Sequence, residues 1–146
     1  MGEYHILPWQ DSYGEAAARL EGECFGENIT AEAFCRFAYA PVNHYFCAVG
    51  EDGTVLGYGG ISLVADEAEI ITVAVSPVCR RQGIARTLME HMLRLAADAR
   101  ATVYLEVRAS NMPAIALYKK FGYEKISLRK RYYSDGEDAE IMQKSL

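Results

Sequence analysis

The hydrophobic pattern of the N-terminal third predicts one short strand followed by two helices. An apolar run at residues 4–7 is typical of a strand. The apolar residues after it recur three and four positions apart, which is the spacing of one helix face. The predicted helices run from Asp11 or Ser12 to about Glu23, and from Thr30 to Tyr39.

The central third of the pattern predicts a hairpin and a buried strand. Two apolar runs enclose Glu51-Asp52-Gly53, and an Asp-Gly pair in this position favours a β-hairpin. The next run, from Ala68 to Ser76, is apolar at nearly every position instead of at alternate ones. Because such a strand has no polar side to turn toward water, we expect both of its faces to be buried.

The C-terminal half of the pattern begins with the longest predicted helix, over residues 83–99. Apolar residues at helical spacing define its buried face, and these are Ile84, Leu88, Met92 and Leu95. The elements predicted after it are an alternating strand at 102–108, a helix with Pro113 in its first turn and Gly122 at its end, and two strands joined near Ser134-Asp135-Gly136.

The order of these predicted elements indicates an α+β domain. A helical crossover returns the chain in the same direction, so the strands at about 68–76 and 102–108 are expected to be parallel neighbours. The hairpin-connected strands on either side are expected to be antiparallel. The prediction is therefore a mainly antiparallel, mixed sheet of about seven strands with about four helices, in a single domain over residues 1–146.

Charge and composition narrow the classes of function. The net charge of −5 argues against a nucleic-acid-binding protein, because neutralising phosphates supplies most of that affinity. No apolar stretch approaches the roughly 20 residues that cross a bilayer, so we expect a soluble, cytoplasmic protein without a membrane partner. The separated cysteines and scattered histidines favour buried free thiols over a metal site or disulfides, and the cysteines are Cys24, Cys35, Cys47 and Cys79.

A candidate anion site lies between the buried strand and the longest helix. Arg80, Arg81, Gln82 and Gly83 lead directly into the predicted helix. A helix N-terminus offers unpaired N–H groups and the positive end of its dipole, both of which suit a phosphate. A solvated turn with two arginines explains the same residues, and the sequence contains neither a nucleotide P-loop nor a dinucleotide GxGxxG motif.

The stretch Arg80-Arg81-Gln82-Gly83-Ile84-Ala85 resembles the acetyl-coenzyme A signature of the GNAT superfamily of N-acetyltransferases. LEVRASNMPAIALYKKFGY, followed by RKRYYSDGEDAEIM, resembles the RimI-type enzymes that acetylate the N-terminal alanine of a small-subunit ribosomal protein. The similarity covers about residues 66–142, whereas the first 60 residues match only in general layout. One position departs from the commonest form, since Ala85 stands where many members have Gly.

The resemblance implies a α/β/α GNAT fold with a splayed parallel strand pair, and acetyl-CoA as the co-substrate with no metal. The arm of acetyl-CoA is then expected to pair with a strand whose neighbour has moved away. The residues that the resemblance assigns to cofactor binding are Val73, Ala74 and Val75 through their backbone, Arg81, Gln82, Gly83, Ile84, Ala85 and Arg86 around the pyrophosphate, and Asn111 through a hydrogen bond.

The catalytic residues implied by the resemblance are Glu106 and Tyr118. Glu106 shares one face of its predicted strand with Tyr104 and Arg108, and as the base it takes a proton from the acceptor amine. Pairing with Arg108 or another cation at a strand end is the structural alternative for this carboxylate. Tyr118 follows Asn111 by about two helical turns, so both can face the cofactor, and its phenol is the expected acid for the leaving thiolate.

Several alternatives remain open at this point. Glu69 is the second candidate for the base, and Cys79 lacks a paired histidine and is taken as a bystander. The basic, aromatic stretch 129–133 is expected to wall the acceptor tunnel, although an RNA contact has the same composition. The predicted function is N-terminal acetylation of a ribosomal protein by a monomer or weak dimer. The alternatives are acetylation of a small-molecule amine and a non-catalytic acetyl-CoA-binding module.

Overall fold

The computed structural model describes residues 3–26 and 28–144, so the ends of the predicted 1–146 domain lie outside the described residues. Seven strands form one sheet in the order β1-β2-β3-β4-β5-β7-β6. The strands are β1 (Tyr4–Pro8), β2 (Asn43–Gly50), β3 (Val55–Val64), β4 (Glu67–Val75), β5 (Thr102–Arg108), β6 (Glu124–Arg129) and β7 (Ala139–Lys144). The helices are α1 (Gly14–Phe25), α2 (Ala31–Ala38), α3 (Ile84–Asp98) and α4 (Met112–Lys120), with 3-10 turns at Asp11–Tyr13 and Pro77–Cys79.

The sheet has the predicted direction pattern. β4 and β5 are parallel, and every other neighbouring pair of strands is antiparallel. The predicted hairpin at Asp52-Gly53 joins β2 to β3, and Gly53 has the left-handed φ of 85° that a tight turn requires. β7 inserts between β5 and β6, so the C-terminal hairpin extends the sheet beyond β5.

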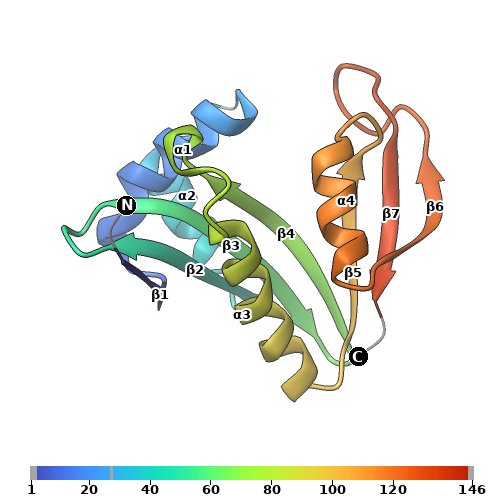
Figure 1. Cartoon of the computed structure of the whole chain (residues 1–146), viewed down its shortest axis with the longest axis horizontal. Coiled ribbons are helices and arrows are strands. Elements are labelled where there is room, and N and C mark those ends of the chain that lie inside the picture. The colour runs from blue at the N-terminus through green and yellow to red at the C-terminus, as the bar shows by residue number, and fades with distance from the viewer. Residues whose placement is uncertain (1–2, 27, 145–146) are drawn as a thin grey trace.

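Helices cover both faces of the sheet (Figure 1). On one face, Met89 and Met92 of α3 and Ile115 of α4 pack against Val103 and Leu105 of β5. On the other face, α1 and α2 pack over β2, β3 and β4 in a cluster rich in aromatic side chains, namely Trp9, Phe34, Tyr45 and Tyr58. The predicted start of α2 is confirmed, because the Thr30 hydroxyl caps it by accepting from the Ala33 N–H at 3.1 Å.

A β-bulge in β4 creates the splay that positions the site. β3 pairs Gly60 with Thr72 and the next residue, Ile61, with Ile70, so Ile71 is an extra residue in β4. A bulge bends its strand and increases the local twist. The parallel pairing of the described residues ends at the same place, at Ile70 opposite Leu105. Figure 1 shows β4 and β5 diverging from the end at which they meet.

Two sequence predictions need correction. The run 68–76 was expected to be buried on both faces, but Ile71, Thr72 and Val73 are half-exposed because the splay opens one side of β4. The first helix was expected to start at Asp11 or Ser12 and end near Glu23. Instead a 3-10 turn occupies Asp11–Tyr13 and the α-helix extends to Phe25.

The cysteines and the helices bear on two further predictions. All four thiols are free, as predicted, but only Cys47 and Cys79 are buried, whereas Cys24 and Cys35 are half-buried. The prediction of buried thiols is therefore correct for two of them. Among the described residues, none of the helices has the length and apolar character needed to span a bilayer.

Candidate active site

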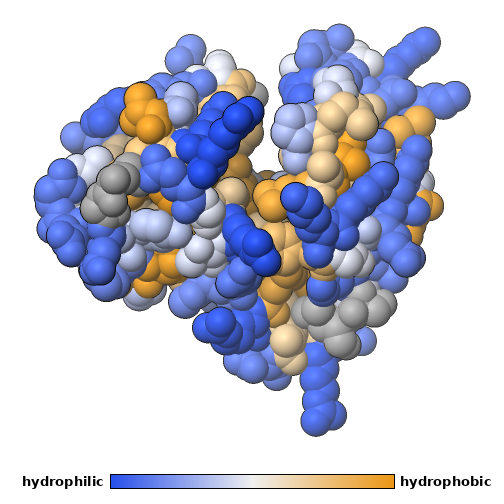
Figure 2. All heavy atoms as spheres, in the orientation of Figure 1, coloured by the Kyte–Doolittle hydropathy of each residue, from blue (hydrophilic) through white to orange (hydrophobic). Residues whose placement is uncertain are grey.

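The splay between β4 and β5 opens into a cavity of about 870 Å³. Its lining residues come from β4 and the α1–α2 region on one side, and from β5, α4 and the loop between β6 and β7 on the other. Figure 2 shows a notch between the two halves of the molecule, with apolar atoms at its floor and hydrophilic side chains at its rim. The fold therefore brings segments from across the chain to one cavity.

Glu106 lies in this cavity because of the alternation along β5. Val103, Leu105 and Val107 are buried, so the intervening side chains face the opposite side of the sheet. The Glu106 side chain is 20% exposed, and its Oε1 lies 3.5 Å from a guanidinium nitrogen of Arg129 on β6. The structural alternative is therefore confirmed in its second form: Arg108 binds other carboxylates, but Arg129 is a cation at the end of β6 and pairs with Glu106.

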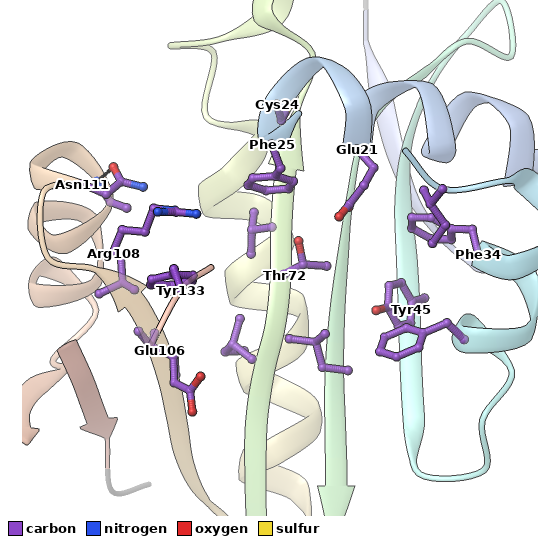
Figure 3. Close-up of a pocket in the computed structure, with 18 of the residues that line it drawn as sticks. Glu21, Cys24, Phe25, Phe34, Tyr45, Thr72, Glu106, Arg108, Asn111 and Tyr133 are labelled. Carbon is purple, nitrogen blue, oxygen red and sulfur yellow. Dashed lines mark hydrogen bonds between the residues drawn. The ribbon is translucent and has the colours of Figure 1, made fainter. Parts of the chain in front are cut away.

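The first helical turns of α4 carry two more predicted residues to the same cavity. Asn111 caps the helix, since its Oδ1 accepts from the Ala114 N–H at 3.3 Å. Its amide nitrogen points toward the cavity (Figure 3). Tyr118 also lines the cavity, and burial, followed by the nearby Tyr133, raises the pKa of Tyr118 to about 12. The phenol therefore keeps its proton at neutral pH and can donate it.

The predicted anion loop has an unusual backbone. Arg81 has φ 66° and Gly83 has φ 80°, so two residues in three adopt the left-handed conformation. For an arginine this conformation is strained, and strain of this kind gathers at functional sites. The N-terminus of α3 has no side-chain cap, so its N–H groups remain available to an anion. Gln82, Ile84 and Ala85 contribute backbone to the same turn.

Two arginines near this loop already have partners. Arg86 pairs with Glu90 at 3.2 Å along α3, so its guanidinium is partly engaged while its backbone belongs to the first helical turn. Arg80, which the sequence placed in the candidate anion site but the resemblance did not assign to the cofactor, donates to the Val75 carbonyl at 3.4 Å. Arg80 therefore fastens the anion loop to the end of β4.

The predicted strand contacts are only partly placed in the cavity. Val73 lines it, whereas Ala74 and Val75 lie beyond its lining residues. Ile71 and Thr72 line it too, and sequence reasoning did not single them out. No signal in the apolar run could have found them, because the bulge depends on how β4 pairs with β3.

The side of the cavity formed by α1, α2 and β2 contains residues that the sequence gave no reason to select. Its walls are aromatic, formed by Phe25, Phe34, Phe37 and Tyr45. Glu21 of α1 also lines it and accepts a hydrogen bond from the hydroxyl of the buried Tyr58. Burial, and then the neighbouring Glu21, raises the pKa of Tyr58. This pairing satisfies the phenol while it leaves the carboxylate facing the cavity.

Glu69, the second candidate base, lies at a smaller cavity of about 370 Å³. Glu106 and Arg129 line the same cavity. Burial, followed by the Glu106 charge, raises the pKa of Glu69, and Arg129 opposes this shift. Glu69 and Glu106 thus share one electrostatic environment. Within residues 3–26 and 28–144, no three metal-ligating side chains cluster as a metal site requires.

Comparisons with known proteins agree with this architecture. The model of the acetyltransferase (GNAT) family matches residues 8–123. A Bacillus subtilis protein named as a candidate ribosomal protein bS18-alanine N-acetyltransferase is 44% identical over 84% of this chain and 83% of its own. The N-alpha-acetyltransferase RimI of Mycobacterium tuberculosis is 37% identical over 89% and 85%. The crystal structure of the Escherichia coli ribosomal-protein-S18-alanine N-acetyltransferase has a TM-score of 0.86 at 31% identity, over 97% and 93%. These likenesses confirm the predicted fold class.

Proposed function

The chain belongs to the acetyltransferase (GNAT) family, and we propose that it acetylates the N-terminal α-amino group of a protein. The most specific form of the proposal is the N-terminal alanine of a small-subunit ribosomal protein. Relatives named for this activity or for N-alpha-acetylation, which span most of the chain, support that acceptor. One structural observation carries the chemistry: Glu106, Asn111 and Tyr118 line a single cavity beside the bulged strand.

Acetyl-CoA is the acetyl donor of this family, and the described residues suit it. The uncapped start of α3, with Arg81 and Gly83 in left-handed conformations, suits a pyrophosphate. The side of β4 that faces away from β3 loses its partner after Ile70, which leaves backbone groups for the amides of the donor's arm. The Asn111 amide faces the same space. We therefore assign acetyl-CoA to the cofactor-binding residues that the resemblance predicted, which are residues 73–75, residues 81–86 and Asn111.

The acceptor class follows from proton affinities. An α-amino group titrates near 8 and a lysine near 10.4, so the neutral nucleophile costs about 3.5 kcal/mol less to form at the N-terminus. Glu106 is the base in this proposal, acting directly or through one water. A guanidinium nitrogen of Arg129 lies 3.5 Å from Glu106 Oε1, so the carboxylate of the proposed base lies beside a cation.

The proton and bond changes balance without a covalent enzyme intermediate. The amine nitrogen forms a bond to the acetyl carbon, the carbon–sulfur bond breaks, and the sulfur leaves with the bonding electrons. The neutral amine loses one proton to Glu106, and Tyr118 gives one to the departing sulfur; a proton then returns through solvent from Glu106 to the Tyr118 phenolate, which restores both groups. Backbone N–H groups near Val75 are proposed to stabilise the charge on the carbonyl oxygen.

The first test compares acceptors. Purified protein is incubated with acetyl-CoA and either alanine-starting peptides or a panel of polyamines and amino-sugar antibiotics, and initial rates are measured. We expect turnover with the peptides. Turnover confined to the small amines would replace the proposed acceptor with a small molecule, and donor binding without turnover on any acceptor would indicate a binding module.

A further inference from the structure

The loop between β6 and β7, residues 130–138, has no regular secondary structure and contributes Tyr133 to the lining of the main cavity. Its own hydrogen bonds shape two turns, since Gly136 N–H donates to the Tyr133 carbonyl at 2.9 Å and Glu137 N–H donates to Asp135 Oδ1 at 3.0 Å. These bonds shape the loop but do not attach it to the rest of the protein. Its attachment must come from elsewhere.

One backbone bond attaches the end of the loop, since the Ala109 N–H donates to the Asp138 carbonyl at 3.0 Å. Arg108, at the end of β5, supplies the side-chain part of the attachment. One guanidinium nitrogen donates to Asp135 Oδ2 at 2.8 Å and to Glu137 Oε1 at 2.9 Å. The second oxygen of Glu137 accepts from the Ser110 N–H at 2.9 Å. The loop carboxylates are thereby bound both to the side chain and to the backbone that follows β5.

The same guanidinium also fixes an aromatic side chain of the cavity. Its carbon lies 4.1 Å from the ring centroid of Tyr133, and Tyr133 lines the main cavity. Figure 3 shows Arg108 beside Tyr133, on the side of the cavity that also carries Asn111. Interaction with the Glu106 side chain raises the pKa of the adjacent Tyr132, so Tyr132 lies near the proposed base. Residues of this loop therefore lie both at the wall of the main cavity and near the proposed base.

From these contacts we infer that Arg108 is a positioning residue that sets acceptor affinity by holding the 130–138 loop over the cleft. The inference rests on the proposed acetylation of a protein N-terminus, because a peptide is the acceptor long enough to lie along this loop. Arginine suits the role because its planar group binds carboxylates and lies on an aromatic ring at the same time, whereas lysine is a point charge.

Steady-state kinetics with an alanine-starting peptide test this inference. Arg108→Gln is expected to raise the peptide KM about tenfold, the size of one charge-assisted contact, while the KM for acetyl-CoA stays within about twofold. Arg108→Lys should recover part of the loss. Arg36→Gln is the matched control, because Arg36 forms an exposed helical pair with Glu32 at 3.3 Å and should leave both KM values unchanged.

A second variant shows whether Arg108 acts through the ring. In a Tyr133→Ala background the guanidinium has no ring to hold, so Arg108→Gln should add less than about threefold to the peptide KM. Full additivity of the two changes would overturn the inference. An equal rise of both KM values together with a lower melting temperature would also overturn it, since that result describes a merely structural residue.

Hydrogen exchange of the loop amides gives a readout that does not depend on the acceptor. Arg131, Tyr133 and Glu137 have bonded N–H groups in the attached loop, and Arg108→Gln should speed their exchange while α3 is unaffected. If the wild-type protein acetylates no peptide, the proposed function fails and exchange alone decides. Faster exchange confined to 130–138 then supports the attachment by Arg108, and unchanged exchange overturns it.

Discussion

The two walls of the cleft differ in whether backbone groups or side chains provide their functional features. On the wall assigned to acetyl-CoA, the features that matter are backbone ones: the bulge at Ile71, the free edge of β4, and the left-handed Arg81 and Gly83. On the opposite wall, where we place the acceptor, they are side chains, with Glu106 placed by strand alternation and Tyr133 in contact with the Arg108 guanidinium. The difference indicates that side-chain changes should alter acceptor use and catalysis far more than donor binding.

The largest effect is expected from Glu106→Gln. The amide keeps the shape of the side chain but cannot accept the proton, so kcat should fall by about a thousandfold, with the KM for acetyl-CoA nearly unchanged. Initial rates at saturating donor, together with donor binding by calorimetry, measure both quantities. A near-normal kcat would show that Glu106 is not the base and that its wall of the cleft takes no part in proton transfer.

Tyr118→Phe is expected to have the next largest effect, lowering kcat about a hundredfold because the sulfur then leaves without a nearby acid. The variant keeps the ring and its packing against Tyr123, whose centroid lies 5.9 Å away. A melting temperature close to the wild-type value serves as the control. Loss of stability in proportion to the loss of rate would indicate a packing role instead.

The pH profile sharpens the same assignment. The pKa of Tyr118 is raised to about 12, so its neutral, proton-donating form persists well above the ordinary pKa of tyrosine and is lost only as the pH rises through that value. The rate should therefore show no loss from Tyr118 up to about pH 10, where an ordinary tyrosine titrates. A fall in kcat below that pH in the wild type, absent in Tyr118→Phe, would contradict the raised pKa.

Gly83→Ala tests the backbone wall and should have a smaller effect. A Cβ at Gly83 meets no atom within 4 Å, so the cost arises only from the positive φ of 80°. We expect a loss of about 1 kcal/mol in stability and about a fivefold higher KM for acetyl-CoA. Gly53→Ala is the matched control, because Gly53 has φ 85° and equally open space but lies in the β2–β3 turn.

The comparison of these two glycines separates donor binding from general stability. Both substitutions should lower the melting temperature alike, and only Gly83→Ala should raise the KM for acetyl-CoA. Equal KM values for acetyl-CoA in the two variants would show that the loop conformation does not affect donor binding. That result would contradict the claim that backbone groups bind the donor.

Glu69→Gln should have the smallest effect, changing kcat by less than about threefold. Glu69 lies at the second cavity, where burial and then the Glu106 charge raise its pKa, so it shares the field of Glu106 without lining the main cavity. The measurement is kcat with the same peptide. A fall as large as that of Glu106→Gln would make Glu69 the base.

The sequence predicted the parts of this site that depend on local pattern. Alternation along 102–108 placed Glu106 opposite the buried Val103, Leu105 and Val107, and Pro113 marked the first turn of α4. Both follow from contacts between near neighbours in the chain. Resemblance to a known family then supplied roles for residues that the pattern had only located.

The parts that the sequence did not predict depend on distant contacts. The bulge at Ile71 arises from the pairing of β4 with β3. A strand that is apolar at nearly every position has the same hydrophobic pattern with or without a bulge. The attachment of Arg108 to Asp135 and Glu137 joins residues 27 and 29 positions apart. The Glu21–Tyr58 pair likewise joins a helix to a strand. None of these leaves a periodic signal.

The most direct test of the central claim is the position of the transferred acetyl group. Purified protein is incubated with acetyl-CoA and one peptide that begins with alanine and carries an internal lysine, and tandem mass spectrometry locates the acetyl group. The account predicts acetylation of the α-amino group alone, and no acetylation in Glu106→Gln over the same time. Acetylation of the lysine, or equal products from both proteins, would contradict it.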